Sequence, residues 1–255
     1  MSVDACADLV RRRDPRRFRA ALAAPMPARG DLMVLFAFNS EIARAPWVTA
    51  EPLIAEMRLQ WWHDAVTEIY GGKPRRHEVV DPLVDCVRRH DLPRELLDGL
   101  IAARRADIHR ERFADWADYA AYIDASSGHH LMLAAQVLGA AKERWPALRG
   151  FASAMGGASF LEALPELAAV GWQPLPEAGG VAHAAELGLA AHALARKDRR
   201  KMPGDLRPLF LSGCHARPVL LRAQKSPDQA HNGAARLSEF ENHLCRLRCQ
   251  ILGRW

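Results

Sequence analysis

The sequence has few cysteines and no long apolar run, and each shortage excludes a class of protein. Five cysteines, an odd number at scattered positions, do not build a disulfide framework. No stretch approaches the ~18 nearly uninterrupted apolar residues of a membrane-spanning helix, which excludes an integral membrane protein. The first ten residues, MSVDACADLV, lack the basic and apolar regions of a secretory signal. We therefore expect a reducing, cytoplasmic environment.

Lysine is also scarce, since Lys supplies only five of the 35 basic residues in a chain of net charge +5. Two basic runs stand out, RRRDPRRFR at 11–19 and ARKDRRK at 195–201. Neither run matches a nucleic-acid-binding motif, so we expect no nucleic-acid partner and interpret both as solvated helix faces. Peripheral contact with the inner face of an anionic membrane remains an alternative for them.

Long segments rich in Ala, Leu, Arg and Glu, separated by Gly and Pro, make up most of the chain of 255 residues. No alternating pattern typical of β-strands interrupts them. The sequence predicts a single-domain, all-α helical bundle over residues 1–222, followed by a polar linker and a terminal helix over 223–255. We expect helices near 4–24, 30–46, 50–70, 79–90, 93–110, 115–139, 142–170, 180–198 and 234–253.

The terminal helix carries an apolar stripe with steps of three and four residues. We expect this stripe to dock on the body of the protein or on a partner. It consists of Leu237, Phe240, Leu244, Leu247 and Ile251.

Segment 50–70 places a charge inside an apolar arc on a helical wheel. Arg58 projects among apolar residues, and Asp64 and Glu68 lie at the edge of the arc. Because a charge that faces a core must be paired or bind something, we favour an ion pair between Arg58 and an acid of a neighbouring helix. An anion held by Arg58, or a cation held by Asp64 and Glu68, remains open. The arc consists of Ile54, Met57, Trp61, Ala65 and Ile69.

Five segments together resemble one known family in their order along the chain. They are DPRRFRAALAAP at 14–25, LFAFNSEIARA at 35–45, EMRLQWWHDAVTEIYGG at 56–72, YIDASSGHHLMLAAQVLG at 122–139 and LRPLFL at 206–211. The resemblance is to the squalene/phytoene synthase family of the isoprenoid-synthase fold, over about residues 8–222. Within it, the chain looks most like a divergent branch that includes the mitochondrial complex I assembly factor 6 and its bacterial relatives.

The resemblance implies a specific chemistry for active members. They condense two prenyl diphosphates head to head in an all-helical cavity, where two D-x-x-x-D motifs on facing helices hold Mg²⁺. A diphosphate leaving group needs such metal ions and cationic side chains to depart in an apolar cavity.

The positions matching these aspartates carry no carboxylate in this chain. Ala43 and Trp47 stand at the first motif, where Asn39 is the polar residue of the same helix face, and Ala163 and Leu167 stand at the second. The expected cavity-lining residues are Asn39, Ala43, Trp47, Arg58, Trp61, Ala163 and Leu167.

Glu162 and Glu166 keep the four-residue spacing but lie about 100° around the helix from the matched positions. We expect both to face solvent, although they are the best remaining metal candidates. Asp107 resembles another family aspartate, for which an ordinary cap or ion pair is the alternative. The candidate metal or diphosphate residues of an active enzyme are Asp64, Glu68, Asp107, Glu162 and Glu166.

A stretch of small residues, Ser126 to Gly128, matches a family segment that permits close helix packing. His129 and His130 follow it. Because adjacent histidines point about 100° apart on a helix, we expect two satisfied histidines rather than joint metal ligands.

Three functions follow from these residues. We favour a non-catalytic assembly or interaction factor with no cofactor, whose partner by resemblance belongs to respiratory complex I. The first alternative is a Mg²⁺-dependent prenyl transferase, and the second is a binder that holds an isoprenoid or lipid without reaction.

Overall fold

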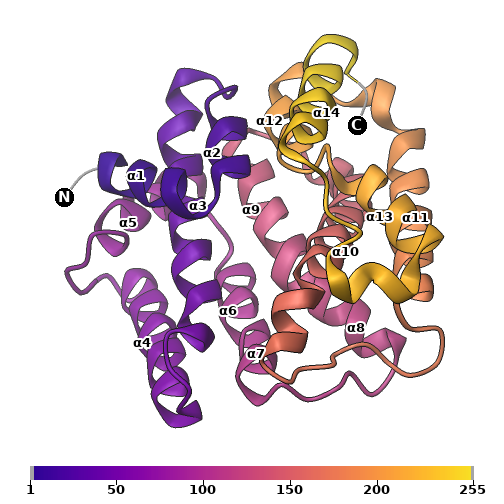
Figure 1. Ribbon diagram of the computed structural model, residues 1–255. Helices are drawn as coiled ribbons and strands as arrows, with labels where there is room; N and C mark the ends of the chain where they lie inside the picture. The colour runs from indigo at the N-terminus through magenta and orange to yellow at the C-terminus, as the bar shows by residue number, and fades with distance from the viewer. Residues whose placement is uncertain (1–2, 254–255) are drawn as a thin grey trace. The chain divides into compact units, whose positions relative to one another are not determined.

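The computed structural model describes residues 3–253, and every regular element within them is helical (Figure 1). The all-α prediction is thereby confirmed. Within this range, no helix is both long enough and apolar enough to cross a membrane. The five cysteines are all free thiols.

The chain divides into two compact units. The first comprises residues 1–109 and 129–141. In it α3 packs against α1, α5 and α9, and α4 packs against α6 and α7. Its helices are α1 (Val3–Arg13), α2 (Pro15–Ala21), α3 (Met26–Arg44), α4 (Pro52–Tyr70), α5 (Val80–His90), α6 (Arg94–Ala103), α7 (Arg105–His109) and α9 (His129–Val137), with a 3₁₀ turn at Ala45–Trp47.

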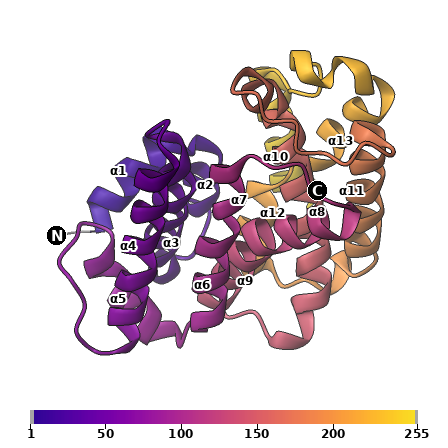
Figure 2. The same ribbon diagram turned by 90° about the horizontal axis from the view of Figure 1, so that it is seen from below.

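The second unit comprises residues 110–128 and 142–255. Helices α10, α11 and α13 pack side by side at its centre (Figures 1 and 2). Its helices are α8 (Trp116–Ile123), α10 (Trp145–Ala169), α11 (Gly180–Lys197), α12 (Arg207–Ser212), α13 (Ala216–Lys225) and α14 (Glu239–Leu252). Short turns lie at Asp124–Gly128 (a π turn) and at Lys142–Arg144, Arg199–Lys201, Gly204–Leu206 and Pro227–Asn232 (3₁₀).

Local chemistry divides some of the predicted helices. The predicted helix 4–24 is two helices, because Pro15 starts α2 and the Asp14 carboxylate caps it by accepting from the Arg17 backbone N–H at 2.9 Å. The predicted helix 93–110 is likewise divided at Arg104. Helices α12 and α13, within 207–225, were not expected.

Close packing accounts for the small residues before α9. A Cβ on Gly156 of α10 would lie 2.6 Å from the Ser127 hydroxyl oxygen and 2.9 Å from a methyl group of Ile123. The π turn therefore approaches α10 as closely as the small-residue stretch predicts.

The buried face of α4 is rotated around the helix axis by part of a turn from the predicted apolar arc. Ile54 and Met57 are 40% and 64% exposed, whereas Leu59 and Trp62 are buried. Leu59, Trp62 and Val66, with Ala65 and Ile69, form the buried face of the helix.

The stripe predicted for the terminal helix does not face the body of the protein. Helix α14 packs against α12, but its buried residue is Cys249, and Phe240, Leu247 and Ile251 are exposed. The predicted division of the chain at residue 222 stays a prediction.

Candidate functional site

The positions that match the first acidic motif lie at the end of α3. Asn39 is buried, and its Oδ1 has no hydrogen-bond partner among the described residues. Ala43 is half-buried, and Trp47 is 38% exposed in the following 3₁₀ turn. Glu41, two residues before Ala43, forms an ion pair with Arg13. This end of α3 therefore offers an amide oxygen but no unpaired carboxylate.

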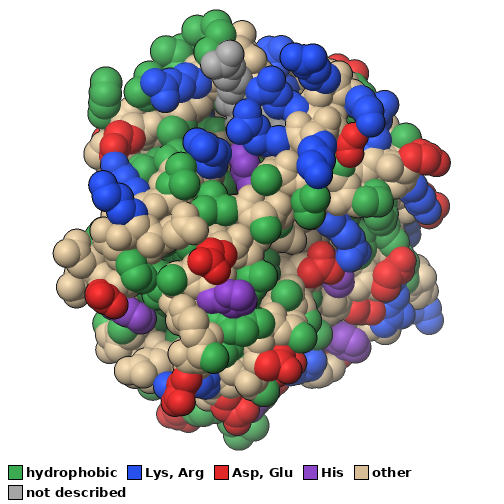
Figure 3. All heavy atoms as spheres, turned by 90° about the vertical axis from the view of Figure 1, so that its right-hand side faces the viewer, with side chains coloured by type: hydrophobic (Ala, Val, Ile, Leu, Met, Phe, Trp, Pro, Cys, Tyr) green, Lys and Arg blue, Asp and Glu red, His purple; other side chains and the backbone are tan. Residues whose placement is uncertain are grey.

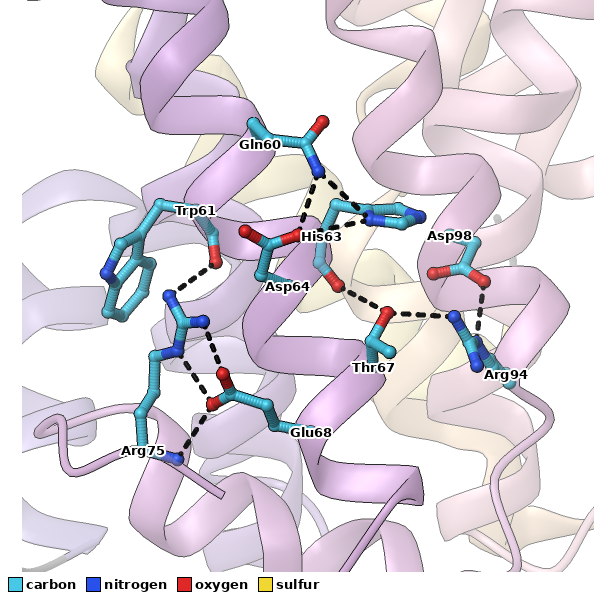
Figure 4. Close-up of polar contacts among 9 residues, drawn as sticks. All are labelled: Gln60, Trp61, His63, Asp64, Thr67, Glu68, Arg75, Arg94 and Asp98. Carbon is cyan, nitrogen blue, oxygen red and sulfur yellow. Dashed lines mark hydrogen bonds and ion pairs between the residues drawn. The ribbon is translucent and has the colours of Figure 1, made fainter. Parts of the chain in front are cut away.

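Glu68 of α4 is held by Arg75 from the loop that follows the helix (Figure 4). The Arg75 guanidinium donates to both carboxylate oxygens, at 2.8 and 2.5 Å, and its backbone N–H donates at 3.2 Å. The guanidinium also lies 4.9 Å from the centre of the Trp61 ring. Hydrogen bonds from Arg75 lower the pKa of Glu68. The carboxylate is thus ionised and already neutralised by a cation.

Asp64, one turn earlier, points to different partners (Figure 4). Its Oδ1 accepts a hydrogen bond of 2.8 Å from the Gln60 amide and lies 3.7 Å from His63 Nδ1. Asp64 and Glu68 therefore do not converge on one position where a cation would sit.

Arg58 is exposed, so the predicted ion pair with a neighbouring helix is wrong. It forms no ion pair with any residue in the described range 3–253. It lines a pocket of about 510 Å³ between the end of α3, α4 and the loop around His77. Arg44, which also has no ion pair within that range, lies at the same pocket. Glu41 and His77 also line it, and the apolar part of the wall includes Ile54, Met57, Trp61 and Trp62.

Asp107 is buried in α7, and its carboxylate lies 3.4 Å from the Arg104 guanidinium. This contact matches the ion-pair alternative for that residue. His130 is buried 5.2 Å from the Phe36 ring, and burial lowers its pKa well below the usual value. Neither of its ring nitrogens has a hydrogen-bond partner among the residues described. The expectation of a satisfied histidine is therefore wrong for His130.

The second motif region lies on α10. Ala163 is half-buried and Leu167 is buried. Glu166 is exposed, as expected, and forms an ion pair with Arg236 that lowers its pKa through a hydrogen bond. Arg236 also donates two hydrogen bonds, of 2.9 and 2.8 Å, to the backbone oxygen of Glu162.

Glu162 does not face solvent, which corrects that expectation. Its side chain is 11% exposed, and its carboxylate lies 3.7 Å from Nε2 of the buried His215. The two glutamates are thus separated: one lies beside a histidine and the other pairs with an arginine.

An aromatic cluster packs near the end of α10. Trp172 is buried, and its indole N–H donates a hydrogen bond of 2.8 Å to the Glu111 backbone oxygen. Phe113 and Phe160 each lie 6.4 Å from the Trp172 ring. Trp172 therefore serves as a packing residue.

Residues 3–253 contain no group of three or more His, Cys, Asp and Glu side chains arranged to hold a metal ion. Each candidate acid instead has a partner of its own, such as Arg75 for Glu68 and Arg236 for Glu166.

The family model described as squalene/phytoene synthase matches residues 10–245. The chain belongs to the squalene/phytoene synthase family. It is similar to the solved squalene synthase HpnC from Alicyclobacillus acidocaldarius, with a TM-score of 0.76, 16% identity, and coverage of 90% of this chain and 94% of that one. A dehydrosqualene synthase in complex with ligand has a TM-score of 0.82 at 11% identity, covering 97% and 95%. These structural likenesses show the isoprenoid-synthase fold.

The similar curated proteins have a different kind of name. The NADH dehydrogenase (ubiquinone) complex I, assembly factor 6 of Bos taurus is 29% identical over 134 residues, which is 52% of this chain and 40% of that protein. The Homo sapiens protein of the same name is 28% identical over the same shares. The Drosophila melanogaster homolog is 32% identical over 42% of this chain and 32% of its own length. The chain therefore spans less than half the length of the curated relatives that it matches.

Sequence reasoning missed the arginines that hold the acids. Arg236 is 70 positions from Glu166, and no pattern connects the two. Arg75 lies seven positions after Glu68, beyond a Gly-Gly turn that reverses the chain, so its proximity was a weak but available signal.

Proposed function

We propose that the chain is a non-catalytic member of its family that acts as an assembly factor, with respiratory complex I as the process that it serves. One observation carries the non-catalytic part: arginines hold two of the acids that could replace the missing aspartates. Arg236 pairs with Glu166 and Arg75 with Glu68.

The physical reason lies in what Mg²⁺ requires. Mg²⁺ binds carboxylate oxygens in near-ideal octahedral geometry, and a metal-bound diphosphate needs several of them close together. Here each arginine already balances the charge of its carboxylate, so a metal ion would first have to break an ion pair. Ala43, Trp47, Ala163 and Leu167 supply no replacement ligand.

The assembly role is supported by similarity to proteins that carry that name. It implies a protein partner among the subunits or assembly factors of complex I. No cofactor is part of the proposal, and we place the chain in the cytoplasm, in peripheral contact with the inner face of a membrane.

Deletion of the gene in its own organism tests the proposal. We expect less assembled complex I on native gels and lower NADH–quinone activity, while squalene and carotenoid levels stay unchanged. The double variant Glu162→Gln/Glu166→Gln should restore assembly as the unchanged gene does. Normal complex I in the deletion strain would contradict the assembly role, and lost prenyl products would favour the enzyme.

The pocket beside Arg58 favours a second candidate, a non-reacting binder of an isoprenoid or lipid with an anionic head. A volume of about 510 Å³ lies in the range of small-molecule sites. Two guanidinium groups at an apolar pocket are complementary to an anion with an apolar tail. Native mass spectrometry of the gently purified protein tests this, and Arg44→Gln/Arg58→Gln should lose the retained mass. A protein without any bound lipid would count against it.

A further inference from the structure

Helix α14 presents an apolar stripe to solvent. Phe240, Leu247 and Ile251 are 75%, 50% and 70% exposed, and Leu244 is half-buried between them. Their spacing of four, three and four residues places all four side chains within about 60° of one another around the helix axis. The helix has 14 residues and is therefore about 21 Å long.

The opposite side of α14 attaches it to the second unit. Cys249, which points about 180° away from Phe240 on the wheel, is 1% exposed. Ser238 and Glu241 form a capping box at the start of the helix, and Glu241 also pairs with Arg222 of α13. The helix is therefore formed and fixed before anything covers its stripe.

The end of the chain that contains α14 is strongly basic. Residues 196–255 contain 13 Arg and Lys against five Asp and Glu, a formal charge of +8, whereas residues 1–195 contain 22 against 25, a charge of −3. In the face that Figure 3 shows, Lys and Arg side chains gather in the upper part, and most Asp and Glu side chains lie lower. The positive charge of the chain is thus concentrated in its last quarter.

Two of these cations lie close to α14. Arg248 is exposed on the helix itself, beside the stripe. Arg207, at the start of α12, is near enough to lower the pKa of the Cys249 thiol, partly offsetting the larger opposite effect of burial.

We propose that α14 lies in the interface of an anionic lipid bilayer, with its apolar stripe among the acyl chains and the surrounding Arg and Lys at the lipid phosphates. Amphipathic helices that lie in a bilayer interface combine such a stripe with cationic neighbours. Each Lys or Arg near an anionic surface adds to the attraction, and a charge of +8 favours a lipid surface over a second, equally basic copy of the chain. The inference deepens the proposed function by naming the surface that meets the membrane, and it rests on that function only for the cellular setting.

Flotation of the full chain with lipid vesicles tests the proposal. The probes are vesicles of phosphatidylcholine alone and of an equimolar mixture of phosphatidylcholine and phosphatidylglycerol. We expect binding to the mixed vesicles, weaker by about tenfold or more on the neutral ones, and falling with added salt.

Matched variants separate the stripe from a general change of charge. Leu247→Glu and Ile251→Glu should each weaken binding by about tenfold or more, because a carboxylate in the apolar stripe opposes both insertion and phosphate attraction. Leu53→Glu makes the same charge change at an apolar residue of α4 that is 73% exposed, and it should bind as the unchanged protein does. Arg207→Gln/Arg248→Gln should bind more weakly and with less salt dependence, and circular dichroism checks that each variant is folded.

Three results would overturn the proposal. The first is equal binding to both vesicle types, and the second is equal binding by the Leu247→Glu and Leu53→Glu variants. The third is a protein that does not bind vesicles but forms a dimer in sedimentation velocity, which the Leu247→Glu variant no longer forms. The last would assign the stripe to a second copy of the chain. The complex I content of a deletion strain is measured independently of vesicle binding. Failure of this inference is therefore distinguishable from failure of the proposed function.

Discussion

Helices α4 and α14 are both amphipathic, yet they use their apolar residues in opposite ways. On α4 the buried face contains Leu59, Trp62 and Val66, and Ile54 and Met57 are additional apolar residues that stay exposed. On α14 the clean stripe is the exposed side, and the residue that docks is Cys249. The difference teaches that an apolar stripe on a helix predicts a contact surface, but it does not predict whether that surface packs against the rest of the chain.

The largest expected effect compares one leucine on each helix. Leu59→Ala should lower the free energy of unfolding by about 2–5 kcal/mol, because Leu59 is 0% exposed and its loss leaves a cavity. Leu247→Ala, at a site that is 50% exposed, should change it by less than about 0.5 kcal/mol. Urea denaturation of both variants measures the contrast. Equal losses would mean that the stripe of α14 is packed in solution, which contradicts the contrast between the two helices.

The docked side of α14 gives the next effect, on thiol reactivity. Burial raises the pKa of the Cys249 thiol to about 11, so near pH 8 it stays protonated and should react with iodoacetamide about a hundredfold more slowly than in the unfolded chain. Arg222→Ala removes the cation that holds Glu241 and should speed the reaction by loosening the helix. Peptide mass spectrometry follows Cys249 over time, with Lys225→Ala as the control. Rapid alkylation in the unchanged protein would show that α14 is not docked.

The smallest expected effect belongs to the ion pair on α4. Because the pKa of Glu68 is lowered in the folded state, its contribution to stability is present above the carboxyl's ordinary pKa and is lost as the pH falls through the lowered value. Glu68→Gln should therefore reduce stability slightly at neutral pH and converge with the unchanged protein in acid. Thermal melts across that pH range detect the convergence. A difference between the two proteins that grows in acid would contradict the assignment.

The sequence predicted the helices well where punctuation is local. The Gly-Gly turn after Tyr70 marks the end of α4, and the long pattern of 142–170 corresponds to α10. Pro15 was an equally local signal, but the predicted helix 4–24 ran through it. Helices α12 and α13 escaped because each is short, and burial of residues such as Leu209 and Val219 depends on tertiary packing rather than on a long periodic signal.

The candidate site was less predictable, for a physical reason. The absence of carboxylates at Ala43 and Leu167 can be read directly from residue identity. Whether Glu166 is available depends on an arginine 70 positions away, and no local spacing encodes that contact. Adjacent tryptophans, Trp61 and Trp62, also made two neighbouring faces of α4 look equally apolar, which shifted the predicted arc.

The central claim is that the arginine-held carboxylates do not organise Mg²⁺ around a prenyl diphosphate. The most direct measurement incubates the purified protein with farnesyl or geranylgeranyl diphosphate and Mg²⁺ and follows pyrophosphate release. We predict no release above the rate without protein. Turnover by the unchanged protein that disappears in Glu162→Ala or Glu166→Ala would contradict the claim.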